Sequence, residues 1–460
     1  LAGRIGALMD RGRNGLGAWG IEIISVDENR LLFSRNADQE FTPASNAKLF
    51  TTAAALDRLG PDFRFRTTVA YEGLLSPAGN LRGHLVLFGG GDPDLDGRIS
   101  GSEDPLAILD SLAARIREMG VRRIEGDVIG DDSYFSYAPW GRGWVVDDVR
   151  QHYGAPISAL SYYGNVLNVT VRPGASTGKP VQVSFRPETS SVQLLNLAAT
   201  GPPSRFITLD HSRVISDGGF FVRGRLPISV PRWERNLPVG NPALYTAQIF
   251  RERLQLHDIE VMGKARSRHS GENSIPLAPV ELLEHYSIPL KEIIPVINKD
   301  SHNQVAEILL RTLGAEKRNN GVDWAGIAEV KDFLAEMGIS TEGLNLYDGS
   351  GLSKLNRVTP RVQTRMLARL AESEHFGDFL NSLAVSGRDG TLKRRLRARS
   401  TNARIFAKTG SLHRVVALGG YVETKSGRKI AFTIFANDHP VGNYLARQVT
   451  DRICEILAES

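Results

Sequence analysis

Ser45 and Lys48 are side chains whose types and spacing could do chemistry together. They open the stretch PASNAKLFTTAAALDRLG (43–60), which reads as a largely buried helix. Residues three apart share a helix face, and a helix N-terminus favours the negative charge of an activated serine. Burial lowers the pKa of a lysine, so Lys48 would serve as a base for Ser45. The alternative is a capping serine beside a lysine whose amine reaches solvent.

The Ser-x-x-Lys pattern is weak by itself, because about two copies are expected by chance in a chain of this length. One further copy lies in a Gly/Pro-rich loop and another in a polar turn between two predicted strands. Only the copy at Ser45 begins a predicted helix. The three copies are Ser45/Lys48, Ser176/Lys179 and Ser426/Lys429.

A second motif, Ser-x-Asn, is placed usefully at Ser301 and Asn303. It lies between two helical segments of PLKEIIPVINKDSHNQVAEILLRTLG, where a short turn would aim both side chains at a common site. A second hydroxyl can relay a proton. The asparagine amide can hold a substrate carbonyl or the lysine. The other copies begin at Ser34 and Ser400.

A third motif, Lys-Thr-Gly, ends the predicted strand ARIFAKTG. Lys408 supplies positive charge and Thr409 a hydroxyl, which together suit a substrate carboxylate. Gly410 lets a substrate backbone approach the strand edge. The backbone N–H groups of Ser411 and Ser45 would form an oxyanion hole. A second Lys-Ser-Gly, at Lys425, falls in a hairpin turn.

The surrounding pattern predicts a mixed α/β fold in which one domain is split by an insertion. Two strands (19–36) and the helix from Ser45 precede a β-rich stretch with many Gly and Pro residues. Helical texture returns near Asn241, followed by a three-strand meander and a last helix. We expect a first part of the split domain at 1–65, a β-rich insert of two smaller domains at 66–235, and the second part at 236–460.

Composition is that of a globular protein, with 41% hydrophobic and 23% charged residues. No apolar run approaches the ~20 residues of a membrane span. The net charge of +5 reads as a modest excess spread along the chain; its densest run, LKRRLRAR (392–399), is interpreted as solvated surface and not as a nucleic-acid site. The single cysteine, Cys454, is expected to pack in the last helix, and redox compartment stays open.

No metal or cofactor is expected from the sequence. It contains no His-Glu-x-x-His and no cysteine pair, and GGGDPDL (89–95) lacks the Lys-Ser/Thr of a phosphate loop. A histidine triad is disfavoured because no Gly-x-Ser-x-Gly elbow is present.

Ser-x-x-Lys, Ser-x-Asn and Lys-Thr-Gly, in this order, are the motif set of penicillin-binding proteins and serine β-lactamases. With PASNAKLFTTAAAL, GGGDPDL, DGSGLS (348–353), GRDGTL (387–392) and AKTGSL, the chain resembles the class C low-molecular-mass penicillin-binding proteins, the D-alanyl-D-alanine carboxypeptidase/endopeptidases of peptidase family S13. The resemblance spans most of the chain. One departure is His302, where the family usually has Asp.

The resemblance implies a transpeptidase-like domain, an antiparallel sheet flanked by helices, interrupted by two inserted domains. It implies that Ser45 is acylated, that Lys48 is the base, and that Ser301 relays a proton to the leaving amine. Asn303 would orient substrate and Lys48, while Lys408 and Thr409 hold the terminal carboxylate. The loops 348–353 and 387–392 would shape the site without taking part in chemistry.

The resemblance also implies peptidoglycan stem peptides as substrates and β-lactams as inhibitors, with no cofactor. The protein would be periplasmic or otherwise extracytoplasmic after removal of a signal peptide, with peripheral membrane association at most. The balance between carboxypeptidase and endopeptidase activity stays open.

The family uses its insert to recognise the amine of a stem-peptide side chain. In IGDDSYFSYAPW (129–140), Asp131 or Asp132 would pair with that amine, and Tyr134 or Phe135 would pack on its methylenes. The alternative is a turn of solvated aspartates over a small aromatic core.

Three other functions share some of these features. A serine β-lactamase-like hydrolase shares the acylation residues but must also activate a deacylating water. A catalytically decayed peptidoglycan-binding protein would not need all five catalytic side chains. A basic-surface binding module is supported only by the charge excess.

Overall fold

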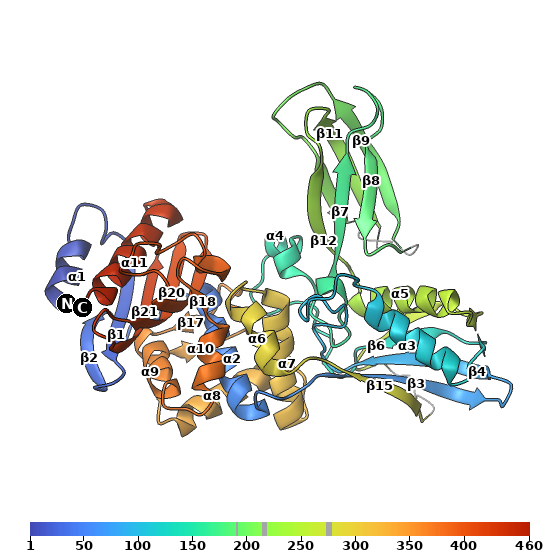
Figure 1. Ribbon diagram of the computed structural model, residues 1–460, viewed down its shortest axis with the longest axis horizontal. Coiled ribbons are helices and arrows are strands. Elements are labelled where there is room, and N and C mark those ends of the chain that lie inside the picture. Colours follow the sequence, from blue (N-terminus) through green and yellow to red (C-terminus); the bar gives the residue numbers. More distant parts are fainter. Residues whose placement is uncertain (190–191, 214–218, 273–277) are drawn as a thin grey trace. The chain divides into compact units, whose positions relative to one another are not determined.

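The computed structural model describes residues 1–189, 192–213, 219–272 and 278–460 (Figure 1). The chain forms two compact units. The first contains Leu1–Arg64, Gly141–Trp144 and Ile288–Ser460; the second contains Phe65–Trp140 and Val145–Ser287. The predicted insert, 66–235, ends earlier than the second unit, because α5 (Pro242–Leu256) packs against β6 and β14 of that unit's own sheet.

A six-stranded antiparallel sheet is the centre of the first unit. Its order is β18-β19-β20-β21-β1-β2. The pairing of β1 with β21 joins the beginning of the chain to its end, so residues far apart in sequence build one domain. The bounds are β1 Ala18–Ser25, β2 Arg30–Arg35, β18 Ala384–Val385, β19 Ile405–Leu412, β20 Val415–Glu423 and β21 Lys429–Asn437.

Helices cover both faces of this sheet, which explains why β20 and β21 are buried along nearly their whole length. On one face, α1 (Ala2–Met9) and α11 (Gly442–Ala458) close a core that includes Cys454. The other face contacts α9 (Pro360–Leu370) and the 3₁₀ turn η1 (Ala44–Asn46). The mixed α/β fold, with an antiparallel sheet flanked by helices, is therefore confirmed.

A group of helices in the first unit packs around the helix that follows Ser45. The predicted helix after Ser45 is α2 (Ala47–Leu59), which contacts α6 (Leu290–Asn298), α7 (Asn303–Arg318) and α8 (Asp323–Glu336) (Figure 1). The short elements are α10 (Phe376–Ser382), β16 (Leu344–Asn345) and β17 (Arg357–Val358).

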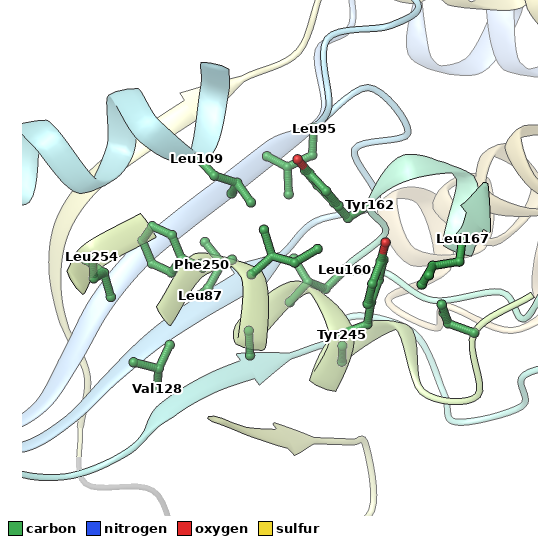
Figure 2. Packing of buried hydrophobic residues seen from close by; sticks show 14 of the residues in the cluster. Leu87, Leu95, Leu109, Val128, Leu160, Tyr162, Leu167, Tyr245, Phe250 and Leu254 are labelled. Carbon is green, nitrogen blue, oxygen red and sulfur yellow. The ribbon is translucent and has the colours of Figure 1, made fainter. Parts of the chain in front are cut away.

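The second unit is built on a seven-stranded sheet, with β13-β5-β4-β3-β15 in order and β6 pairing β4 and β14. Figure 2 shows α3 (Ala107–Glu118) and α5 placing Leu109 and Phe250 over this sheet, near Leu87 and Val128. Its strands are β3 Arg66–Leu75, β4 Asn80–Gly89, β5 Arg123–Ile124, β6 Val128–Asp131, β13 Glu260–Val261, β14 Ala265–Arg268 and β15 Val280–Tyr286; α4 is Val146–Val149.

Two three-stranded sheets are formed by residues 166–238 of the second unit. One has the order β12-β7-β8 and the other β10-β11-β9. Their strands are β7 Val166–Arg172, β8 Gln182–Arg186, β9 Leu194–Gly201, β10 Asp210–Arg213, β11 Phe220–Pro227 and β12 Trp233–Pro238 (Figure 1). Within the part of the chain that the structure describes, no helix combines the length and apolar character needed to cross a bilayer.

A close backbone contact fixes the turn that carries Ser45. Gly351 has φ +80°, and a Cβ atom there would lie 1.8 Å from the carbonyl oxygen of Ala44. Gly338 has a similar φ of +72°, but a Cβ there would meet nothing within 4 Å. Alanine substitutions at the two positions therefore distinguish the cost of the backbone conformation from the cost of a steric clash.

Gly351→Ala should destabilise the protein more than its matched control, Gly338→Ala. The control bears only the left-handed backbone cost, about 1–2 kcal/mol. The clash adds about 1–3 kcal/mol or forces the turn at Ala44 to move. Urea unfolding of both variants, monitored by tryptophan fluorescence, measures the difference. Equal losses of stability would show that the close contact between Gly351 and Ala44 is absent.

Candidate active site

The first two motifs meet at the amine of Lys48. Its Nζ lies 3.2 Å from Ser45 Oγ and 2.7 Å from Asn303 Oδ1. The second and third motifs meet where Lys408 Nζ donates to Ser301 Oγ at 2.8 Å. The structure thus brings together the five side chains that the sequence predicts to be catalytic.

Ser45 lies in a 3₁₀ turn just before the helix and not at the helix start itself. The turn is Ala44–Asn46, and α2 begins at Ala47. Asn46 ties this turn to the third motif, because its Nδ2 donates to the carbonyl oxygen of Lys408 at 3.0 Å. Gln363 donates in turn to Asn46 Oδ1 at 2.9 Å. The turn is therefore fastened to β19 and to α9.

Lys48 is fully buried, as the apolar helix predicts. Burial lowers its pKa to about 7, against the opposing charges of Asp348 and Glu307. A third acceptor, the carbonyl oxygen of Ser350, lies 2.5 Å from Nζ. A neutral amine has two hydrogens and one lone pair. Because the Asn303 and Ser350 oxygens can only accept, they take both hydrogens and leave the lone pair facing Ser45.

Glu307 holds the Ser350 carbonyl in place. Its carboxylate accepts from the backbone N–H of Gly349 at 3.0 Å and of Ser350 at 2.8 Å. Burial and the nearby Asp348 raise the pKa of Glu307, whereas the two N–H donors favour its charged form. Glu307 lies one helical turn after Asn303, so one face of α7 supplies both supports for Lys48.

Asp348 organises the rest of this loop. One carboxylate oxygen accepts from the N–H of Gly351 at 2.9 Å, and the other accepts from Trp144 Nε1 at 2.9 Å. Ser353 Oγ donates to the carbonyl oxygen of Arg142 at 2.7 Å. The segment Gly141–Trp144, which lies within the insert in sequence, therefore belongs to the first unit and supports the 348–353 loop.

The lysine of the third motif is fully buried, although the sequence analysis assigned it a positive charge. Lys408 has no exposed surface, and its Nζ donates to Ser301 Oγ and to the carbonyl oxygen of Thr409 at 2.9 Å. Burial, and then the charge of Lys48, place the pKa of Lys408 well below its usual value. The charge predicted for Lys408 is therefore conditional, because an anion beside it would raise this pKa.

The neighbouring residues of the motif contact several elements. Thr409 Oγ1 donates to Thr391 Oγ1 at 2.9 Å, which connects β19 to the loop 387–392. A Cβ at Gly410 would lie 2.9 Å from the Pro43 carbonyl oxygen, so the strand passes directly against the Ser45 turn. Ser411 Oγ accepts from Asn443 at 2.8 Å. His302 caps α7 and accepts from the Val305 N–H.

In the stretch predicted to bind the stem-peptide amine, the structure gives both aspartates partners from the same unit. Asp131 is buried and lies 3.3 Å from the Arg268 guanidinium. Asp132 is also buried, and it accepts from Ser158 Oγ at 2.7 Å and contacts His269 Nδ1 at 2.7 Å. The aspartates are therefore not solvated, and the contact with a stem-peptide amine stays a prediction.

Phe135 is buried as well, at 2% exposure, and it packs against Tyr134. This part of the insert therefore resembles the aromatic-core alternative, except that the aspartates are engaged in hydrogen bonds and ion pairs. The two other Ser-x-x-Lys serines, Ser176 and Ser426, are both exposed.

Three contributors were missed by the sequence analysis: the Ser350 carbonyl, Glu307 and Trp144. Glu307 had a detectable signal, since it is a lone charge in the apolar run VAEILL and lies four residues after Asn303. The Ser350 carbonyl is a backbone group, and Trp144 is distant in sequence, so neither leaves a local signal. Among the described residues, no group of three or more His, Cys, Asp or Glu side chains is arranged to hold a metal ion.

Comparisons with known proteins agree with this geometry. Residues 5–460 match the D-Ala-D-Ala carboxypeptidase 3 (S13) family. The chain is 34% identical over 454 residues to the D-alanyl-D-alanine carboxypeptidase of Actinomadura sp. (strain R39), covering 96% of this chain and 81% of that protein. It is 28% identical to the D-alanyl-D-alanine carboxypeptidase DacB of Haemophilus influenzae, covering 91% and 85%.

A solved structure extends the comparison to the whole fold. Penicillin-binding protein 4 (dacB) of Haemophilus influenzae superposes with a TM-score of 0.85 at 26% identity, covering 99% of each chain. The same protein complexed with a β-lactam gives a TM-score of 0.80 at 25% identity, covering 99% of this chain and all of that one. The chain therefore belongs to the D-Ala-D-Ala carboxypeptidase 3 (S13) family and is an enzyme of that class.

Proposed function

We propose that Ser45 is the nucleophile that cleaves the terminal D-Ala-D-Ala bond of peptidoglycan stem peptides. The observation that carries this proposal is the contact set of Lys48 Nζ: two oxygens that can only accept, on Asn303 and Ser350, and Ser45 Oγ at 3.2 Å. In the neutral amine the two acceptors take both hydrogens, so the lone pair is left for Ser45. A neutral lysine in this position removes the hydroxyl proton as the oxygen attacks the carbonyl carbon.

Other groups of the site act in the later steps of the reaction. The oxyanion is stabilised by the N–H groups of Ser45 and Ser411, a contribution of roughly 3–4 kcal/mol per donor in comparable sites. Ser301 passes a proton to the departing D-alanine amine as the C–N bond breaks, and the Ser45 ester remains. Water then attacks that ester and releases the shortened peptide and free Ser45.

Recognition of the terminal carboxylate falls to Lys408 and Thr409. The carboxylate stabilises the ammonium form of Lys408, so substrate binding itself establishes the charge that burial disfavours. The same acylation step applies to a D-alanyl bond made to a side-chain amine, which is the endopeptidase reaction. Because peptidoglycan stem peptides are cross-linked outside the cytoplasm, the proposed activity implies an extracytoplasmic protein.

β-Lactams should acylate the same serine, since penicillin-binding protein 4 of Haemophilus influenzae is named for penicillin binding and its structure holds a β-lactam. A labelled penicillin should therefore form one adduct, on the peptide that contains Ser45. Intact-mass spectrometry and peptide mapping measure it, with Ser45→Ala as the unlabelled control. Label on Ser176 or Ser426 would contradict the assignment.

Lys48→Arg should nearly abolish this labelling, because a guanidinium keeps its proton and cannot act as a base. Lys408→Arg should be milder and should mainly weaken recognition of the carboxylate. Stopped-flow acylation rates for both variants distinguish the two roles. Equal losses from the two substitutions would refute the division of labour.

Glu307→Gln should slow acylation by roughly ten- to a hundredfold, the range expected for loss of hydrogen bonds to a charged group. A glutamine amide presents N–H to one of the two backbone N–H groups and releases the Ser350 carbonyl. Loss of the negative charge also lowers the pKa of Lys48, since Glu307 raises it. The acid limb of the kcat/KM profile should therefore move to lower pH.

The matched control is Glu329→Gln. Glu329 is also buried and helical, but it pairs with Arg318 at 2.6 Å and does not hold the Ser350 loop. This control should leave the pH profile in place. A Glu307→Gln profile that superimposes on the wild type would contradict a positioning role for Glu307.

A further inference from the structure

The basic excess of the chain is concentrated in one segment and is not spread along it. Residues 166–238 contain nine Lys or Arg and four Asp or Glu. Their excess of five equals the net charge of the entire protein, so the remaining residues are balanced. The expectation of an evenly spread excess is therefore wrong. We call residues 166–238, with their two small sheets, the basic lobe (Figure 1).

One sheet of the basic lobe also exposes large apolar side chains. On β9, Leu195 is 55% exposed and Leu197 is 59% exposed. The two residues are two apart, so they lie on the same face of the strand. In the register with β11, Leu195 is opposite Phe221 and Leu197 is opposite Arg223. This outer face therefore alternates apolar groups with a basic one.

The loops at one end of this sheet also expose apolar side chains. Phe206 is 83% exposed, the highest value among the large hydrophobic residues described, and Ile207 is 40% exposed. Hydrogen bonds between Ser204 and Ser229, at 2.9 and 3.2 Å, hold the 202–209 loop beside the loop after β11. Ile228, in the second loop, is 39% exposed.

Exposed arginines flank these apolar residues. Arg205 immediately precedes Phe206, and Arg225 lies on β11, where its backbone N–H donates to Thr208 Oγ1 at 3.2 Å. Arg223 lies over the Phe221 ring at 5.4 Å and pairs with Asp210. The surface therefore combines positive charge with side chains that gain by leaving water.

We propose that the basic lobe docks on an anionic lipid surface, with Phe206 and Ile207 entering the headgroup boundary. Peripheral proteins bind such surfaces through apolar burial together with attraction of Lys and Arg to lipid phosphates. A soluble polyanion would satisfy the arginines but would leave Phe206 in water. The lipid surface is the partner that uses both features, and exposed apolar patches of this kind mark interaction sites.

The experiment is vesicle co-sedimentation of the full chain, with vesicles of phosphatidylcholine alone or mixed with phosphatidylglycerol. The wild type should bind the mixed vesicles, bind phosphatidylcholine weakly, and lose affinity as salt rises. Arg205→Gln with Arg225→Gln should weaken binding by about 30-fold, because each lost charge weakens it about fivefold. Phe206→Ser should weaken it by about tenfold.

Matched controls remove the same groups elsewhere. Leu74→Ser changes a residue that is 75% exposed on β3, and Arg397→Gln with Arg399→Gln removes two charges from the run 392–399. Both controls should bind vesicles as the wild type does. All variants should keep their unfolding midpoint and their acylation by penicillin, so failure of docking is distinct from failure of the catalytic proposal.

Several results would overturn lipid docking. The first is no binding to mixed vesicles, and the second is equal binding to both vesicle types. The third is unchanged binding by Phe206→Ser together with full competition by heparin; this third result would indicate a polyanion site. Self-association in sedimentation velocity that Phe206→Ser abolishes would identify a second copy of the chain as the occupant instead.

Discussion

The burial of the Lys48 amine, surrounded by acceptors instead of a paired carboxylate, is the constraint on which the rest of the site depends. An ammonium in this position loses its hydration and gains only dipoles in direct contact, so its proton is weakly held. The carboxylates of Glu307 and Asp348 act at one remove, through the backbone of the 348–353 loop. They oppose the loss of the proton without forming an ion pair that would fix it.

The fold positions Lys48 by holding segments that are distant in sequence against the turn that carries Ser45. Pairing of β1 with β21 closes the sheet, and Asn46 and Gly410 hold the Ser45 turn against β19. One face of α7 supplies both Asn303, which contacts Lys48, and Glu307, which holds the 349–350 backbone beside it. The short segment Gly141–Trp144 completes the support from within the inserted sequence.

The sequence predicted the parts of this arrangement that have a local signal. Helical and strand periodicity located α2, α6, α7 and the final meander, and motif order identified the five side chains that meet. The Ser350 carbonyl and the Trp144 contact were invisible, because they depend on tertiary contacts between segments without a shared period. The burial of Asp131 and Asp132 was not predicted for the same reason: their partners, Arg268, His269 and Ser158, are remote in sequence.

The most direct test of this catalytic site is the protonation state of Lys48 itself. In protein labelled with ¹³C and ¹⁵N at lysine, NMR titration follows each side-chain amine, and the Lys48 signal is assigned by its absence in Lys48→Arg. We expect the Lys48 amine to titrate near pH 7, whereas exposed lysines titrate near 10.4. A Lys48 signal that remains that of an ammonium ion beyond pH 9 would contradict it.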